Sequence, residues 1–98
     1  MHAETSLHLM YYDEIWSVEI RGKARKVLKK ITAKSTAAIL DVIESLKRDP
    51  FGGDIEKLGG EVNAWRRRVG PYRIFYEIYQ HTHYVYVYWV ERRGSHTY

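Results

Sequence analysis

The 98-residue sequence contains no cysteine, which excludes disulfide bridges, thiol nucleophiles and metal sites built on cysteine. It also has no apolar run near the roughly 18 residues that a membrane-spanning helix requires. Its first twenty residues hold acids but neither lysine nor arginine, so they lack the basic start of a signal peptide. The sequence therefore predicts a cytoplasmic protein with no membrane partner.

Lysine is missing from the C-terminal part of the chain as well. Residues 62–98 contain no lysine and only two acids, Glu77 and Glu91. They contain six arginines: Arg66, Arg67, Arg68, Arg73, Arg92 and Arg93. Arginine keeps its charge and presents a rigid fork of donors that matches the geometry of a phosphate. This composition predicts a protein that handles a phosphodiester, either by binding it or by cutting it.

Other basic residues gather between positions 21 and 48. That segment holds nine lysines and arginines against Asp41 and Glu44, and the whole chain carries a net charge of +4. An apolar fraction of 45% in 98 residues is typical of one globular domain. A basic surface of this kind indicates nucleic-acid binding first and an ordinary solvated face second.

Hydrophobic periodicity predicts an α+β fold with the element order β-α-α-β-β-β. Residues 1–13 form a peripheral lead-in in this interpretation, and residues 14–98 form a single domain. Residues 16–20 alternate apolar and polar side chains, as a strand does. Two sets of apolar residues follow the spacing of helices buried on one side: Ala24, Val27, Leu28 and Ile31, then Ile39, Val42, Ile43 and Leu46.

The second helix is expected to start at Ser35, a favourable N-cap residue, and to stop before Pro50. Because the link between the helices is short, they should form an antiparallel hairpin. Residues 51–60 carry two pairs of glycines and are predicted to form a loop. An antiparallel meander of three strands, near 62–69, 71–79 and 84–91, then packs on the helical hairpin.

Side-chain alternation places Arg66 and Arg68 together on the sheet face away from the helices. Trp65 and Val69 then point toward the helices, and Arg73 follows the turn closely enough to approach Arg66 or Arg68. Like charges opposite each other destabilise a sheet, so a cluster without an acid partner requires an anion. The alternative is a polar outer face with scattered charges.

The last strand and the tail carry further candidates. From Tyr84 to Val90 aromatic residues recur at alternate positions, where they can stack on bases or serve as ordinary strand residues with one polar end. The tail beyond the strand is short and polar. His96, Tyr98 and an arginine could together supply proton transfer and charge stabilisation there.

Four segments, LKRDP, IEKLGG, WRRRVGPYRIFYEI and ERRGSHTY, resemble the RelE/ParE superfamily of toxins from toxin–antitoxin systems. The resemblance covers about residues 14–98, and the W-R-x-R-V-G-x-Y-R core is fairly specific to the superfamily. It implies the β-α-α-β-β-β fold and, on the RelE-like branch, an endoribonuclease that needs neither metal nor cofactor. Such toxins cut mRNA, usually in the ribosomal A site, and a cognate antitoxin holds them in a tight complex.

The resemblance also implies roles for individual residues. The basic residues of the site would be Arg66, Arg68, Arg73 and one of Arg92 and Arg93, with Tyr98 as the C-terminal tyrosine. RelE toxins often have lysine at the first two of these positions, and an arginine cannot act as a base. His96 or Tyr98 is therefore the expected general base for attack by the RNA 2′-OH, which leaves a 2′,3′-cyclic phosphate and a 5′-OH end.

Three further expectations complete the prediction. Arg67 occupies a position that is usually apolar in relatives, so it must reach an edge past Trp65 or pair with an acid. Lys23, Lys26 and Lys30 on the first helix either dock on ribosomal RNA or form a solvated face. Two alternatives to the RNase remain: a ParE-like inhibitor of DNA gyrase, and an RNA-binding member without turnover.

Overall fold

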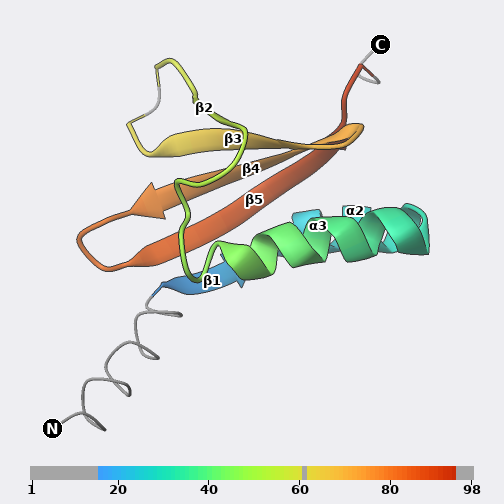
Figure 1. The fold of residues 1–98 in the computed structure, drawn as a ribbon, viewed down its shortest axis with the longest axis horizontal. Coiled ribbons are helices and arrows are strands. Elements are labelled where there is room, and N and C mark those ends of the chain that lie inside the picture. The colour runs from blue at the N-terminus through green and yellow to red at the C-terminus, as the bar shows by residue number, and fades with distance from the viewer. Residues whose placement is uncertain (1–15, 61, 95–98) are drawn as a thin grey trace, which may run out of the picture.

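The computed structural model describes residues 16–60 and 62–94 (Figure 1). Its elements in chain order are β1 (Ser17–Ile20), α2 (Gly22–Lys30), α3 (Ala33–Ser45), β2 (Ile55–Lys57), β3 (Ala64–Val69), β4 (Tyr72–Tyr79) and β5 (Tyr84–Arg92). The predicted α+β class is confirmed, with a strand, two helices and then the remaining strands. The lead-in expected over residues 1–13 lies outside the described residues, as do His96 and Tyr98.

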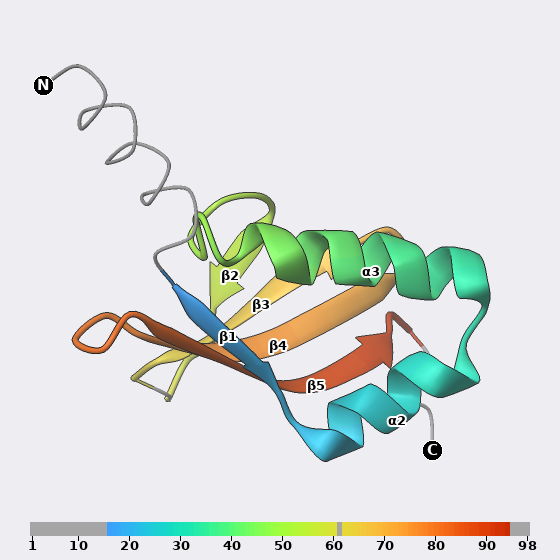
Figure 2. The same cartoon turned by 90° about the horizontal axis from the view of Figure 1, so that it is seen from below.

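The five strands form one sheet in the order β1-β5-β4-β3-β2. β3, β4 and β5 form the predicted antiparallel meander, and β1 pairs in parallel with β5. α2 and α3 run in opposite directions over the same face of this sheet (Figure 2). Within the described residues no helix covers the other face, which is called the open face below.

The hydrophobic core lies between the helices and the sheet. Every second residue of β4 is buried, because strand side chains alternate between the two faces. The core comprises Tyr72, Ile74, Tyr76 and Ile78 of β4, Val85, Val87 and Val90 of β5, and Ala24, Leu28, Ile39, Ile43 and Leu46 from the helical segment. The predicted apolar faces of both helices are therefore confirmed, and Trp65 and Val69 pack against this core as expected.

The start of the second helix differs from the prediction. α3 begins at Ala33, and its N-cap is Thr32, whose hydroxyl oxygen accepts a hydrogen bond from the Ser35 backbone N–H at 3.1 Å. Threonine and serine are both good N-cap residues, so the sequence offered two starting points three positions apart. Thr32 is used because Ser35 then supplies the N–H that the cap requires.

The segment 51–60 was predicted to be a loop, and this was wrong in part. Ile55–Lys57 forms the edge strand β2, which pairs antiparallel with β3 and brings Glu56 opposite Arg66. A strand of three residues is too short to show a clear alternation, and the flanking glycines hide it further. This short strand determines the charge of the candidate site, as described below.

A shift in pairing between β4 and β5 shapes the middle of the open face. Phe75 pairs with Trp89, but the next residue of β4 pairs with Val87, so β5 has one extra residue, Tyr88, at this point. An extra residue of this kind is a β-bulge. Val87 and Val90 both stay in the core, while the ring of Tyr88 lies 6.2 Å from that of Phe75. Two consecutive aromatic residues, Tyr88 and Trp89, consequently lie on the open face.

Candidate functional site

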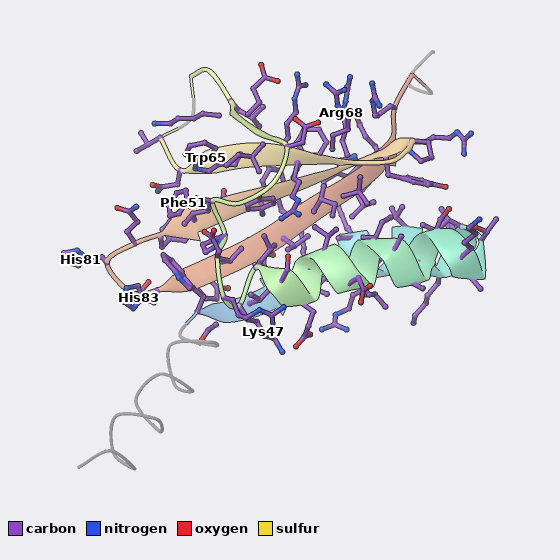
Figure 3. The ribbon with its side chains drawn as sticks, in the orientation of Figure 1. Lys47, Phe51, Trp65, Arg68, His81 and His83 are labelled. Carbon is purple, nitrogen blue, oxygen red and sulfur yellow. The ribbon has the colours of Figure 1, made fainter. Side chains whose placement is uncertain are left out.

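The candidate site is a cluster of three arginines on the open face. Arg66 and Arg68 come from β3, and Arg73 lies directly opposite Arg68 at the start of β4, which is one of the two approaches that the sequence left open. Figure 3 shows Arg68 on the side of the sheet that faces away from the helices. The three side chains surround a hollow of about 40 Å³ together with Asp54 and Glu56.

Each arginine of the cluster has a carboxylate partner. Arg66 donates from Nε and Nη2 to one oxygen of Glu56, at 3.0 and 2.6 Å. The Nε of Arg68 lies 3.3 Å from Asp54, and the Nη1 of Arg73 lies 3.7 Å from Glu91. The sequence predicted that the arginine cluster has no acid partner and so requires a bound anion, and this prediction was wrong. Residues 62–98 hold only Glu77 and Glu91, but two further acids come from earlier in the chain, Glu56 on β2 and Asp54 in front of it.

These ion pairs leave the arginines available to another anion. The Arg68 and Asp54 side chains are 56% and 64% exposed, and Glu56 is also 64% exposed. Exposed pairs of this kind contribute only about 0–1 kcal/mol, because water competes for both charges. A phosphate could replace a carboxylate at little cost, and the displaced carboxylate would stay nearby as a proton acceptor. Arginine alone cannot provide that second function.

The two late arginines are held elsewhere. Arg92 lies opposite Tyr72, and its guanidinium is 5.8 Å from the centre of the Tyr72 ring, on the helix-facing side of the sheet. The Nη1 of Arg93 donates to the backbone carbonyl of Gly70 at 3.2 Å, at the turn between β3 and β4. Both therefore lie at the end of the sheet where Arg68 and Arg73 meet, Arg92 on the helix-facing side and Arg93 at the turn.

Arg67 points toward the helix-facing side and approaches the loop after α3. A Cβ atom on Gly53 would lie 2.4 Å from the central carbon of the Arg67 guanidinium. The positive charge of Arg67 also acts on the buried phenol of Tyr76. Of the two outcomes predicted for Arg67, the structure thus favours the first, in which the side chain extends past the core to an edge.

Gly53 offers a test of this packing. We expect Gly53→Ala to lower the free energy of unfolding by about 2–3 kcal/mol, since Gly53 has φ +85° and an added Cβ would displace the Arg67 guanidinium. Gly60→Ala is the matched control, because Gly60 has φ +80° but no atom near the added Cβ. Urea denaturation should show a smaller loss for Gly60→Ala, about 1–2 kcal/mol. Equal losses would contradict the close approach of Arg67.

The lysines of α2 lie on the surface. Lys23, Lys26 and Lys30 are all exposed, and α2 buries Ala24 and Leu28. The lysines therefore belong to a different surface from the arginine cluster, on the helical side of the molecule.

The tyrosines at the far end of the open face form hydrogen bonds to acids. The Tyr84 hydroxyl donates to Glu19 at 2.7 Å, and the Tyr79 hydroxyl donates to Glu77 at 2.7 Å. Both bonds favour the protonated phenol: the bond to Glu19 raises the pKa of Tyr84 to about 12, and the bond to Glu77 raises the pKa of Tyr79. The alternating aromatics of β5 thus lie on the open face, while the valines between them enter the core.

Sequence reasoning missed Asp54 and Glu56 as members of the site. Asp54 directly follows the glycine pair Gly52-Gly53, and Glu56 comes two residues later, ten residues ahead of Arg66; this spacing is the signal that could have identified them. Residues two apart on a strand share a face, so both carboxylates can meet arginines of a neighbouring strand.

Comparison with known proteins places the chain in a known family. The model of the family "ParE toxin of type II toxin-antitoxin system, parDE" matches residues 18–95. No curated protein matches the chain significantly. Within the described residues no helix is both long and apolar enough to cross a membrane.

Solved structures of toxins share the fold. The RelE–RelB complex of Pyrococcus horikoshii superposes with a TM-score of 0.75 at 22% identity, covering 83% of this chain and 98% of that chain. The toxin–antitoxin complex RelBE2 of Mycobacterium tuberculosis gives 0.71 at 26% identity, covering 80% and 98%. The YoeB/ParE toxin of Agrobacterium tumefaciens gives 0.66 at 21% identity, covering 79% and 98%.

Proposed function

The chain belongs to the ParE toxin family of type II toxin–antitoxin systems, and we propose that it acts as an mRNA-cleaving toxin. The observation that carries this proposal is the convergence of Arg66, Arg68 and Arg73 on one hollow of the open face. Three guanidinium groups can surround the non-bridging oxygens of one phosphodiester. Cleavage in the ribosomal A site and a cytoplasmic location are part of the proposal.

RNA carries its own nucleophile, so the protein needs to supply only alignment, charge and proton transfer. The 2′-oxygen gives its proton to a base and forms a bond to phosphorus, the bond from phosphorus to the 5′-oxygen breaks, and that oxygen takes up a proton. In this scheme Arg73 stabilises the charge that develops on the phosphorane, while Arg66 and Arg68 position the backbone. The products are a 2′,3′-cyclic phosphate and a 5′-OH end.

The structure adds a candidate for the base. His96 and Tyr98, the residues expected from the sequence, lie outside the described residues. Glu56 lies inside the cluster, and its carboxylate contacts Arg66 at 2.6 Å. A carboxylate that a phosphate displaces from Arg66 would remain within reach of the 2′-OH as a proton acceptor. Glu56, His96 and Tyr98 are therefore the three alternatives for this role.

The experiment that tests the function is end mapping of mRNA in a reconstituted translation reaction. We expect cuts in the ribosomal A site whose upstream fragments carry cyclic-phosphate ends. The base is identified by measuring the cleavage rates of Glu56→Gln, His96→Gln and Tyr98→Phe separately. The variant that replaces the base should cleave about 10²–10⁴-fold more slowly, the loss expected for an acid–base group. Intact mRNA at every toxin concentration would refute the proposal.

A second function has its own support. The matching family model is that of ParE toxins, and each arginine of the cluster already pairs with a carboxylate. Both facts suit a protein that binds DNA gyrase and performs no nuclease chemistry. A DNA supercoiling assay distinguishes the two, because a gyrase inhibitor would block supercoiling while leaving mRNA intact.

We also propose that the chain is held by an antitoxin protein. Structures similar to it include toxin–antitoxin complexes. An antitoxin segment rich in aspartate and glutamate would complement the arginine cluster and replace the contacts to Asp54, Glu56 and Glu91.

The lysines of α2 give a separate prediction on ribosome binding. Replacing Lys23, Lys26 and Lys30 together by glutamine should weaken binding to ribosomes and flatten its salt dependence. Each lost phosphate contact lowers the slope of log K against log salt by about 0.7–0.9. Filter binding over a series of salt concentrations measures this slope. An unchanged slope would mean that these lysines form a solvated face only.

A further inference from the structure

The open face carries a second patch, whose chemistry is opposite to that of the arginine cluster. Tyr79, Tyr84 and Tyr86 line a hollow of about 330 Å³ together with Glu77 and Thr82. The rings of Tyr79 and Tyr84 are 5.9 Å apart and inclined by 28°, and those of Tyr84 and Tyr86 are 6.4 Å apart and inclined by 16°. The three rings therefore form one continuous aromatic surface at the β4–β5 hairpin end of the sheet.

Two carboxylates flank the middle of this surface. In the register of the sheet, Tyr86 lies directly between Glu19 on β1 and Glu77 on β4. Neighbouring strands are about 4.8 Å apart, so both acids stand beside the Tyr86 ring. The tyrosine–glutamate patch is defined here as Glu19, Glu77, Tyr79, Tyr84 and Tyr86.

The two carboxylates of this patch are open to a further partner. Glu19 and Glu77 each accept a hydrogen bond from a tyrosine hydroxyl, which leaves one oxygen of each carboxylate for a further partner. Over residues 16–60 and 62–94, neither acid has a lysine or arginine within ion-pair distance. The patch therefore differs from the arginine cluster, where every charge is already paired.

We propose that the tyrosine–glutamate patch binds an arginine- or lysine-bearing segment of the antitoxin. The face of a tyrosine ring attracts a cation, and a guanidinium can stack on it while donating to a carboxylate at its edge. Tyr86 with an acid on either side provides both interactions in one place. A single-stranded nucleic acid could use the same rings for stacking, but two unpaired carboxylates would repel its phosphates.

The distance between the tyrosine–glutamate patch and the arginine cluster predicts the orientation in which an antitoxin segment binds. Arg73 and Tyr79 are six residues apart on β4, which corresponds to about 20 Å along a strand. An antitoxin segment with acidic residues over the arginine cluster and a basic residue about 20 Å away would match the open face in one orientation and be repelled in the reverse one. The inference rests on the proposed function for the identity of the occupant, but its test does not depend on cleavage.

The test uses the whole chain labelled with ¹⁵N and follows backbone amide shifts on addition of three probes: an oligoarginine peptide, an oligoglutamate peptide and an oligouridylate. We expect oligoarginine to shift the amides of the patch and oligoglutamate to shift those of the arginine cluster. Glu19→Gln combined with Glu77→Gln should weaken oligoarginine binding about tenfold. Tyr86→Leu should weaken it about threefold, whereas Tyr86→Phe retains the ring and the binding.

Asp41→Asn, a change at an exposed acid of α3, is the matched control and should leave oligoarginine binding unchanged. Two results would overturn the proposal: oligoarginine shifts that are the same in the double glutamine variant, or patch shifts caused by oligouridylate and not by oligoarginine. The second result would assign the rings to RNA. If the purified chain does not cleave mRNA, by contrast, the RNase proposal is refuted and the proposal for the tyrosine–glutamate patch is unaffected.

Discussion

Replacing Arg73 by alanine is expected to reduce mRNA cleavage by about 10²–10³-fold, because a well-aimed charge in such a site is worth about 3–4 kcal/mol in the transition state. Arg73 is the member of the cluster best suited to this role. Its side chain is only 29% exposed, compared with 56% for Arg68, so water screens its charge least. It also lies directly opposite Arg68, where the two guanidinium groups can contact one phosphate from both sides.

Single-turnover cleavage of a short RNA on ribosomes is the measurement. Arg48→Ala is the matched control, since Arg48 is exposed beyond the end of α3 and on the helical side of the molecule. Arg73→Lys keeps the positive charge but lacks the planar, two-pronged donors of a guanidinium, so its cleavage rate should lie between those of Arg73→Ala and the parent chain. Thermal unfolding should show similar stability for all three variants, because the Arg73–Glu91 pair is partly solvated. An undiminished rate for Arg73→Ala would remove the arginine cluster from the chemistry.

The acids around Arg73 show where prediction from sequence stops. The alternation of β3 was enough to place Arg66 and Arg68 on one face, and the Gly70-Pro71 turn was enough to bring Arg73 near them, but not to fix the register that sets it opposite Arg68. Those are local relations within two strands joined by a tight turn. The partnership of Arg66 with Glu56 depends on the antiparallel pairing of β3 with β2, a strand of three residues, and no periodic pattern in the sequence predicts that pairing.

The order of strands in the sheet was likewise beyond prediction from local sequence patterns. The helices were predictable, because a single apolar face repeats over several turns in each. The parallel pairing of β1 with β5 joins segments more than sixty residues apart, and both strands are compatible with other neighbours. The tyrosine–glutamate patch depends on that pairing, since Glu19 comes from β1 and the tyrosines come from β4 and β5.

Tyr76 is expected to dominate the stability of the fold. Its ring is fully buried in the core, and its hydroxyl donates to the carbonyl of Pro50 at 3.3 Å. Tyr76→Ala should lower the free energy of unfolding by about 3–5 kcal/mol, as for other aromatic residues removed from cores. For a domain of this size that is a large part of the total, and each kcal/mol corresponds to about 4–8 °C in Tm. Tyr76→Phe keeps the ring and should lose only about 1 kcal/mol, the contribution of the hydrogen bond.

The buried phenol also predicts how stability changes at alkaline pH. Burial raises the pKa of Tyr76 from 10.0 to about 12, against a smaller lowering by the positive charge of Arg67. Below pH 10 the phenol is protonated in both folded and unfolded chains, so its contribution is fully present. Between pH 10 and about 12 the unfolded chain releases the proton while the folded chain retains it, and stability falls by up to about 1.4 kcal/mol per pH unit. Above the folded-state pKa this contribution is lost and the decline ends.

Urea denaturation of the parent chain and of Tyr76→Phe, over a series of alkaline pH values, isolates this effect. Lysines and the other tyrosines titrate in both proteins, so the difference between them reports Tyr76 alone. The advantage of the parent chain should shrink as pH rises through that window and then reverse, because a buried tyrosinate is destabilising and a phenylalanine has no proton to lose. A constant difference between the parent and Tyr76→Phe would show that the phenol titrates as freely in the folded chain as in the unfolded one.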